Sequence, residues 1–275
     1  MAKFEKMRVS LARAEATPMD GAMGESKPRR DRSEHLKAAF SDERKFLHLR
    51  NNIRFTFTPI TCPSGFVGGV FKRERPEILR NENLEPYKAE NYEIAIVVLS
   101  IDKDQISWVE VNQKLGSSKS LLESFLNYLL TKTDINDWRP YVEYFDNSDD
   151  YWKVIKERKS EIASVKFTFV PPNPLGASDL VYKVVKDISL EAHPEVQQHV
   201  YRAKPGAMDL DTPMMRASAE IAMKGGGDAE IHDEKRHILY SSSGSRVIDT
   251  VDDDELPTPA QPAFMVRLID RLFKR

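Results

Sequence analysis

The apolar segment YEIAIVVLSI, residues 92–101, constrains the fold more than any other part of the sequence. Almost every position is apolar and β-prone, which predicts a strand that is covered on both faces. The turn DKDQ at 102–105 leads into ISWVEV at 106–111, so the two segments are expected to form a β-hairpin. The clearest core of the chain is therefore expected between residues 92 and 190.

Flanking segments supply the other predicted elements. IRFTFTPI at 53–60 alternates apolar and polar residues, which predicts a half-buried strand. SKSLLESFLNYLL at 118–130 carries leucine and phenylalanine at helical spacing, and Ser120 with Glu123 fits a capping box. Further strands are expected at 141–145, at 163–170 and in short segments between 229 and 251, and further helices after residue 148, at 180–188 and at 213–224.

These elements predict an α+β fold, in which helices pack on a mixed, mainly antiparallel sheet. Residues 15–35 are rich in small, polar and helix-breaking residues, and residues 251–263 are acidic and proline-rich. A flexible N-terminal arm and a tethered C-terminal amphipathic helix are expected as a result. The predicted parts are a partly disordered arm over 1–50, a single α+β domain over 51–250, a linker over 251–263 and a helix over 264–275.

The C-terminal segment FMVRLIDRLFKR is strongly amphipathic. Its apolar side chains fall on one stripe of a helix, and most of its cations lie near the end, where the helix dipole favours them. A helix this short is marginal in water unless it docks. It is expected to bind a protein partner or a second protomer; docking on its own domain and weak membrane-surface binding are the alternatives. The residues proposed for partner binding are Phe264, Met265, Leu268, Ile269, Arg271 and Leu272.

Two basic runs, KPRRDR at 27–32 and FKRERPE at 71–77, predict a second kind of contact. Phenylalanines are interleaved with them, and nucleic-acid binding needs both phosphate-neutralising charge and stacking surface. DNA or RNA is therefore a possible partner. The alternative is a solvated basic face over buried phenylalanines. The residues proposed for nucleic-acid binding are Arg29, Arg30, Arg32, Lys72, Arg73 and Arg75.

No catalytic set has a diagnostic spacing. Acids and histidines between residues 209 and 233 would suit a metal-dependent nuclease or phosphohydrolase if they converged in the fold. The alternative places 233–236 in the solvated turn of a hairpin and the glycines at 225–227 in a helix C-cap. We expect no catalytic residue, metal site or cofactor. The candidates for the alternative activity are Asp209, Asp228, Glu230, His232 and Asp233, with His193 and His199 as possible further ligands.

Cysteine content and hydropathy bound the environment. Cys62 is the only cysteine, which excludes an intrachain disulfide and a thiolate-rich zinc site. The apolar run at 94–99 is far shorter than the roughly 20 residues that cross a bilayer, and the first 16 residues lack the apolar stretch of a signal peptide. A cytoplasmic protein without a membrane span is expected. Charge is segregated, with net +4 over residues 1–50, −6 over 226–256 and +3 over 257–275, which suggests surfaces that meet partners.

From about residue 92 onward the chain resembles a bacterial family known only as a domain of unknown function and encountered beside phage-defence genes. The similar segments are EIAIVVLSI, QKLGSSKSLLESFLNYL at 113–129, KFTFVPPNP at 166–174 and AEIAMKGGGD at 219–228. The resemblance implies a bacterial antiviral setting and assigns no catalytic residue. Together with the segregated charge and the tethered helix, it leads us to expect a non-enzymatic binding or regulatory subunit.

Overall fold

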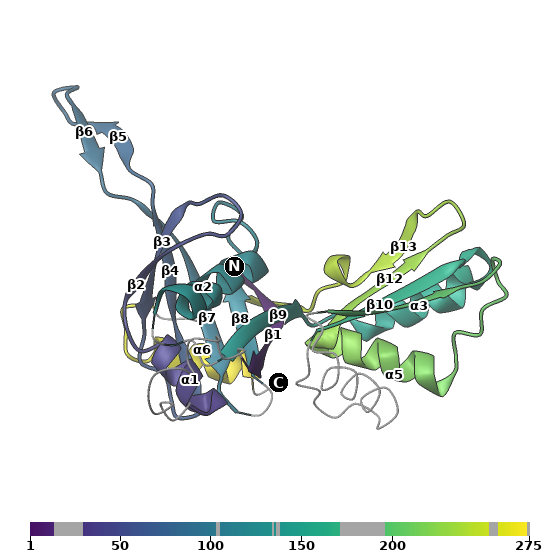
Figure 1. Ribbon diagram of the computed structural model, residues 1–275. Coiled ribbons are helices and arrows are strands. Elements are labelled where there is room, and N and C mark those ends of the chain that lie inside the picture. Colours follow the sequence, from purple (N-terminus) through teal and green to yellow (C-terminus); the bar gives the residue numbers. More distant parts are fainter. Residues whose placement is uncertain are drawn as a thin grey trace.

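The computed structural model has two lobes, each built on its own β-sheet (Figure 1). Neighbouring strands pair antiparallel in both sheets and helices lie against them, which confirms the predicted α+β class with its mainly antiparallel sheet. The structure describes residues 1–13, 30–102, 105–133, 135, 138–170, 196–252 and 258–273.

The large lobe contains an eight-stranded sheet. Its strands are β1 (Ala2–Arg13), β2 (Arg44–Leu47), β3 (Arg54–Pro59), β4 (Phe66–Glu74), β7 (Tyr92–Ser100), β8 (Ile106–Glu110), β9 (Trp138–Tyr144) and β14 (Ile248–Val251). They follow the order β14-β1-β8-β7-β4-β3-β2, and β9 pairs with β1 next to β14. The hairpin predicted over 92–111 is present as β7 and β8, and the strand predicted over 53–60 is present as β3.

The N-terminal segment is the main departure from the prediction. Residues 2–13 form the long strand β1 inside the sheet, with β8 along one edge and β14 followed by β9 along the other. The expectation of an arm over residues 1–50 is therefore wrong for this segment. Its apolar pattern is hard to read because the buried side chains change face between Phe4 and Met7, and because the charged residues Glu5 and Arg8 are buried as well.

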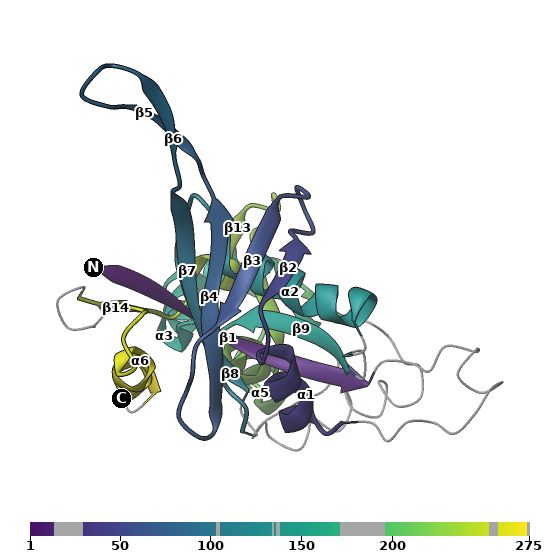
Figure 2. The same ribbon diagram turned by 90° about the vertical axis from the view of Figure 1, so that its left-hand side faces the viewer.

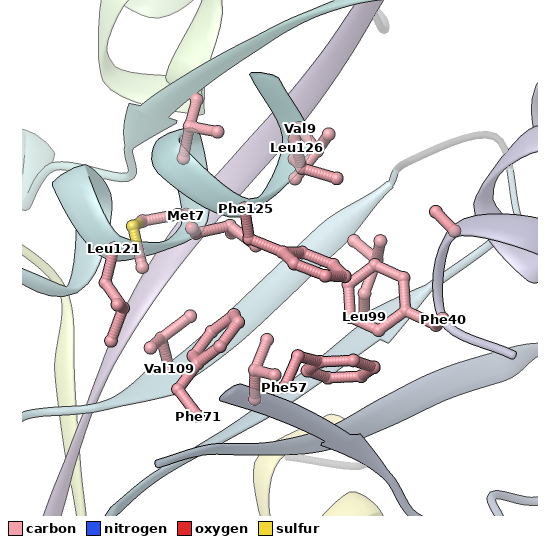
Figure 3. Close-up of a cluster of buried hydrophobic side chains, with 14 of the residues drawn as sticks. Met7, Val9, Phe40, Phe57, Phe71, Leu99, Val109, Leu121, Phe125 and Leu126 are labelled. Carbon is pink, nitrogen blue, oxygen red and sulfur yellow. The ribbon is translucent and has the colours of Figure 1, made fainter. Parts of the chain in front are cut away.

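Helices cover both faces of the large sheet (Figure 2). α1 (Arg32–Ala39) and α2 (Ser118–Lys132) lie on one face, and α6 (Phe264–Phe273) lies on the other. Phe125 of α2 is at the centre of the first core, where its ring centroid lies 4.6 Å from that of Phe57 and 5.5 Å from that of Phe71 (Figure 3). The helix cap differs by one turn from the prediction: the Ser117 hydroxyl, not that of Ser120, accepts the capping hydrogen bond.

The small lobe has a four-stranded sheet with its own core. Its elements are α3 (Ser148–Arg158), β10 (Ser164–Phe169), β11 (Gln197–Arg202), α5 (Pro213–Ile221), β12 (Gly227–His232) and β13 (Ile238–Ser241), with the strand order β11-β10-β12-β13. Tyr151, Phe167 and Ile231 are fully buried in this core. The helix predicted at 180–188 falls outside the described residues.

The small lobe is inserted into the large one between β9 and β14. The chain leaves and returns side by side, since the Asn147 amide donates to the Ser245 carbonyl at 2.7 Å and the Val247 amide donates to the Phe145 carbonyl at 2.8 Å. We call these two segments, 144–147 and 245–248, the neck. The single domain expected over 51–250 is thus divided between two lobes with separate cores.

A third, two-stranded sheet leaves the body of the large lobe. β5 (Glu77–Arg80) and β6 (Pro86–Ala89) pair with each other between β4 and β7. Both views show this hairpin extending away from the sheet (Figures 1 and 2). We call residues 75–91 the hairpin arm.

Candidate functional site

The hairpin arm presents apolar side chains to solvent. All four residues of β5 are exposed: 79% of the surface of Ile78 and 42% of that of Leu79 is accessible to solvent. Leu84, in the turn at the tip, has 69% of its surface exposed. Isolated exposed apolar residues are ordinary on protein surfaces, but three on one small hairpin are unusual. Ile78 and Leu79 are consecutive on β5 and so lie on opposite faces of the hairpin, which leaves apolar surface on both faces.

The tip of the arm is an ordered turn. The Asn81 side-chain oxygen accepts hydrogen bonds from the amides of Asn83 and Glu85, both at 3.0 Å, and the Asn81 amide donates to the Glu85 carbonyl at 3.1 Å. Leu84 has φ of 63°, in the left-handed region that costs a residue with a side chain about 1–2 kcal/mol. The turn therefore keeps an apolar side chain at the tip in a conformation that glycine would adopt more easily.

The arm does not carry the charge of a nucleic-acid contact. Residues 75–91 contain three basic and four acidic residues, a net charge of −1. At the base of the arm, Lys88 lies 3.7 Å from Glu74, so basic and acidic groups neighbour each other. Phosphate binding depends on an excess of cations, which this hairpin lacks.

A second candidate site is a pocket of about 260 Å³ at the junction of the lobes, which we call the interlobe pocket. The large lobe contributes the start of α2, the end of β9 and the loop after β2. The small lobe contributes the start of β12 and the turn at 242–244. The lining residues are Arg50, Ser117, Lys119, Glu143, Tyr144, Asp146, Gly227, Asp228, Ser242, Ser243 and Arg246.

Three carboxyl groups in the interlobe pocket have raised pKa values. Burial, followed by the nearby charges of Asp228 and Glu143, raises the pKa of Asp146 to about 8. Burial is also the main cause that raises the pKa of Glu143 and of Asp228. Titratable groups perturbed by burial in a concave site are candidates for function.

Glycine allows the two lobes to approach closely beside this pocket. Gly225 has φ of 72°, as in a helix C-cap, so the structure agrees with the simpler interpretation of the glycine run. A Cβ atom at Gly225 would lie 2.6 Å from the Cβ of Arg8 on β1. The Asp146 amide donates to the Met223 carbonyl at 2.9 Å. The end of α5 is thereby joined to the large lobe.

The C-terminal helix is not available as a partner-binding surface. α6 turns its apolar stripe onto the sheet of its own chain, against Phe4, Val98 and Trp108. Arg271 lies 3.4 Å from Asp249 and donates to the Thr250 carbonyl at 3.1 Å, next to the stripe. The helix is therefore docked on its own domain, which was the alternative to partner binding. The buried side chains are Phe264, Met265, Leu268, Ile269 and Leu272.

The proposed nucleic-acid residues are not brought together. Arg29 lies outside the described residues, Arg30 and Arg32 lie at the start of α1, and Lys72, Arg73 and Arg75 lie where β4 enters the hairpin arm. Both views place α1 and the arm at opposite ends of the large lobe (Figures 1 and 2).

The individual environments of these basic residues also differ. Arg32 lies over the Trp138 ring at 5.1 Å, and Arg73 donates to the Lys114 carbonyl at 3.3 Å. Phe55 and Phe57 are buried in the core rather than available for stacking. In the part of this region that the structure covers, the basic residues therefore form a solvated face over buried phenylalanines and not a nucleic-acid-binding groove.

The acidic and histidine candidates are scattered as well. Asp228, Glu230 and His232 share one face of β12, but Asp209 precedes α5 and Asp233 lies in the β12–β13 turn, where His237 Nδ1 is 2.9 Å away. Only Asp228 reaches the interlobe pocket. His193 lies outside the described residues, and His199 is on β11. Among the residues that the structure describes, no three histidines, cysteines or carboxylates could hold a metal ion.

Cys62 has no sign of reactivity. Burial raises the pKa of its thiol to about 11, so little thiolate exists at neutral pH. Cys62 is a partly buried free cysteine.

Sequence reasoning missed both the hairpin arm and the interlobe pocket. The asparagines at 81 and 83 between two short extended segments were the available signal for the arm. The pocket had no local signal, because its residues come from five separate segments of the chain.

Comparison with protein-family models, curated protein sequences and solved structures gave no match. The resemblance to a family found beside phage-defence genes therefore stays a prediction, as does the cytoplasmic location. No helix in the described ranges has the length and apolar character to cross a membrane.

Proposed function

We propose that this protein is a non-enzymatic binding or regulatory subunit that attaches to a protein partner through its hairpin arm. The observation that carries the proposal is the arm itself: an ordered, projecting hairpin with Ile78, Leu79 and Leu84 exposed. The antiviral setting follows from the sequence resemblance alone and is part of the proposal.

The chemistry of the arm favours a folded protein as the partner. Full burial of an isoleucine or leucine side chain stabilises a complex by roughly 1.5–3 kcal/mol. Three such side chains offset only part of the association cost of about 4–15 kcal/mol, so further contacts are needed. The outer edges of β5 and β6 supply them, because an exposed strand edge can pair with a strand of another protein.

The partner surface is expected to be an apolar groove with mixed charge at its rim. Arg80 and Lys88 are interspersed along the arm with Glu77, Glu82 and Glu85, and such a mixture fits a partner with charges of both signs. Nucleic acid is disfavoured by the net charge of −1.

Affinity purification from the cells that naturally make the protein tests this function. The full-length protein is compared with the double variant Ile78→Ser/Leu84→Ser and with the control Glu77→Gln/Glu82→Gln, which changes the same hairpin without altering its exposed apolar residues. We expect one protein to co-purify with wild type and control and to be lost from the serine variant. Titration of that purified protein should show binding at least about 30-fold weaker for the serine variant, as for an interface hot spot.

Two results would contradict the proposal. If all three baits retain the same proteins with equal affinity, the arm is not the attachment element. If light scattering shows a wild-type dimer and a monomeric serine variant, the arm binds a second copy of this chain instead of a different protein. An antiviral role additionally predicts that deletion of the gene, or its replacement by the serine variant, increases phage plating on the natural host.

A further inference from the structure

Three cations line the interlobe pocket. Arg50 is exposed, and the other two, Lys119 and Arg246, are already engaged by carboxylates. Lys119 pairs with Glu143 at 2.5 Å. Arg246 pairs with Glu5 at 2.8 Å, and its guanidinium lies 4.2 Å from the centre of the Tyr144 ring. Neither cation is therefore a dedicated partner for the remaining acids of the pocket.

Asp146 is the acid that remains. It lines the pocket, keeps 7% of its surface, and neither side-chain oxygen accepts a hydrogen bond from any residue in the described part of the chain. Ser242 lies near it, but the single hydroxyl hydrogen of Ser242 is donated to Asp228. Leaving a buried polar group without a hydrogen bond costs about 1–3 kcal/mol, and more when the group is charged. A ligand with hydrogen-bond donors and positive charge would remove that cost.

We propose that the interlobe pocket binds a primary amine, with its ammonium group between Asp146 and Asp228. An ammonium group has three hydrogen-bond donors, which suits two carboxyl groups that lie close together. The volume of about 260 Å³ also accommodates an aliphatic stem of several carbons, since one water occupies about 30 Å³. A metal ion is disfavoured, because no three ligands converge among the described residues.

Two sources share this chemistry: a free aliphatic amine and the side chain of a lysine in a peptide. In either case the ammonium group would be held by both lobes at once, since Asp146 belongs to the neck and Asp228 to β12. Binding would therefore stabilise one arrangement of the lobes. This inference is independent of the hairpin arm, which lies on another part of the large lobe.

Proton release should accompany binding. Asp146, with a pKa of about 8, is largely protonated at neutral pH and must lose that proton to hold an ammonium group. Affinity should thus increase with pH up to that pKa, by at most about tenfold per pH unit. The charged and titratable groups around this corner are Glu5 of β1, Arg50 of the loop after β2, Lys119 of α2, Glu143 and Tyr144 of β9, Asp228 of β12, Tyr240 of β13, Asp150 of α3 and Arg246 of the neck.

Isothermal titration of the full chain tests the proposal, with butylamine and an acetylated Gly-Lys-Gly amide as probes and 1-butanol as the uncharged control. We expect saturable binding of at least one ammonium probe one pH unit above the pKa of Asp146, about tenfold weaker binding one unit below it, and none for 1-butanol. Binding of butylamine identifies a free amine as the ligand type, and binding of the peptide alone identifies a lysine side chain.

Two variants distinguish binding in the interlobe pocket from nonspecific binding to exposed carboxylates. Asp146→Asn should abolish binding, whereas Glu157→Gln, an exposed carboxylate on α3, should leave it unchanged. A thermal melt of Asp146→Asn confirms that the variant is folded. The proposal is wrong if neither probe binds at millimolar concentration above the pKa, if Asp146→Asn binds as tightly as wild type, or if 1-butanol binds as well as butylamine.

Discussion

Gly68 is the residue that allows α6 to lie close to the sheet. A Cβ atom at this position would be 2.6 Å from the Val97 carbonyl oxygen and 2.5 Å from the Met265 methyl carbon. The methionine end can move, but the carbonyl belongs to the neighbouring strand and cannot move without shifting the sheet. The absence of a Cβ atom at position 68 is therefore needed for this packing.

We expect Gly68→Ala to lower the free energy of unfolding by about 1–3 kcal/mol, as is usual for an overpacked core. Gly244→Ala is the matched control, since nothing lies within 4 Å of a Cβ atom there. The control should change stability by no more than about 0.5 kcal/mol. Urea unfolding monitored by circular dichroism measures both, and equal effects would show that the contact with Val97 is unimportant.

Asp146 should make stability depend on pH. Its folded pKa of about 8 is above the value of 3.8 in an unfolded chain, so between these values the folded state binds more protons. The stabilisation that protonated Asp146 contributes is fully present below its unfolded pKa of 3.8. It decreases as the pH rises and is lost once the pH has passed the folded pKa of about 8. Asp146→Asn removes the effect, and we expect the variant to be more stable than wild type above pH 8, by on the order of 2 kcal/mol. Melting temperatures across this range check the sign, and a variant that is less stable at high pH would contradict it.

At the scale of elements, α6 is part of the core of the large lobe. Leu268 is fully buried between the helix and the sheet, whereas Val266 on the same helix keeps 46% of its surface. We expect Leu268→Ala to cost about 2–5 kcal/mol of unfolding free energy and Val266→Ala less than about 0.5 kcal/mol. Chemical denaturation of the two variants measures the difference. Similar small losses in both would mean that α6 detaches readily and could still bind a partner.

Elements with a strong local pattern could be predicted from the sequence. β7 and β8 follow from a continuous apolar run and a short turn, and α2 follows from the spacing of Leu121, Phe125 and Leu129. β1 could not be predicted, because charged and apolar side chains are buried together on it. The hairpin arm escaped for the opposite reason: its apolar residues are exposed, and hydrophobic patterns indicate burial.

The pocket depends on tertiary structure alone. Asp146 and Asp228 are separated by more than half the small lobe in sequence, and they come together because residues 222–226, just before β12, pack against the end of β9. No spacing rule relates them. The sequence did identify Asp228 as chemically interesting, but with Glu230 and His232, which lie further along the same face of β12 and do not line the pocket.

At the scale of the whole molecule, the adjacent ends of the neck predict that the lobes can be separated. Asp146 and Arg246 form a bridge between the two segments, so a two-residue Asn-Gly turn in place of residues 147–245 would complete a hairpin. We expect the shortened chain to fold with a single cooperative transition at a lower temperature, since the contacts of residues 222–226 with β1 and β9 are lost. Calorimetry measures this, and absence of a cooperative transition would show that the large lobe needs the inserted one.

The position of β1 also determines when the large lobe can finish folding during synthesis. β1 is made well before β14 and α6, yet one of its edges pairs with β14 and its Phe4 side chain packs with α6. Until β14 and α6 have been made, the nascent chain carries an open strand edge and an uncovered aromatic side chain, both of which favour aggregation. A chaperone that holds β1 until α6 has been made would therefore increase the yield of folded protein.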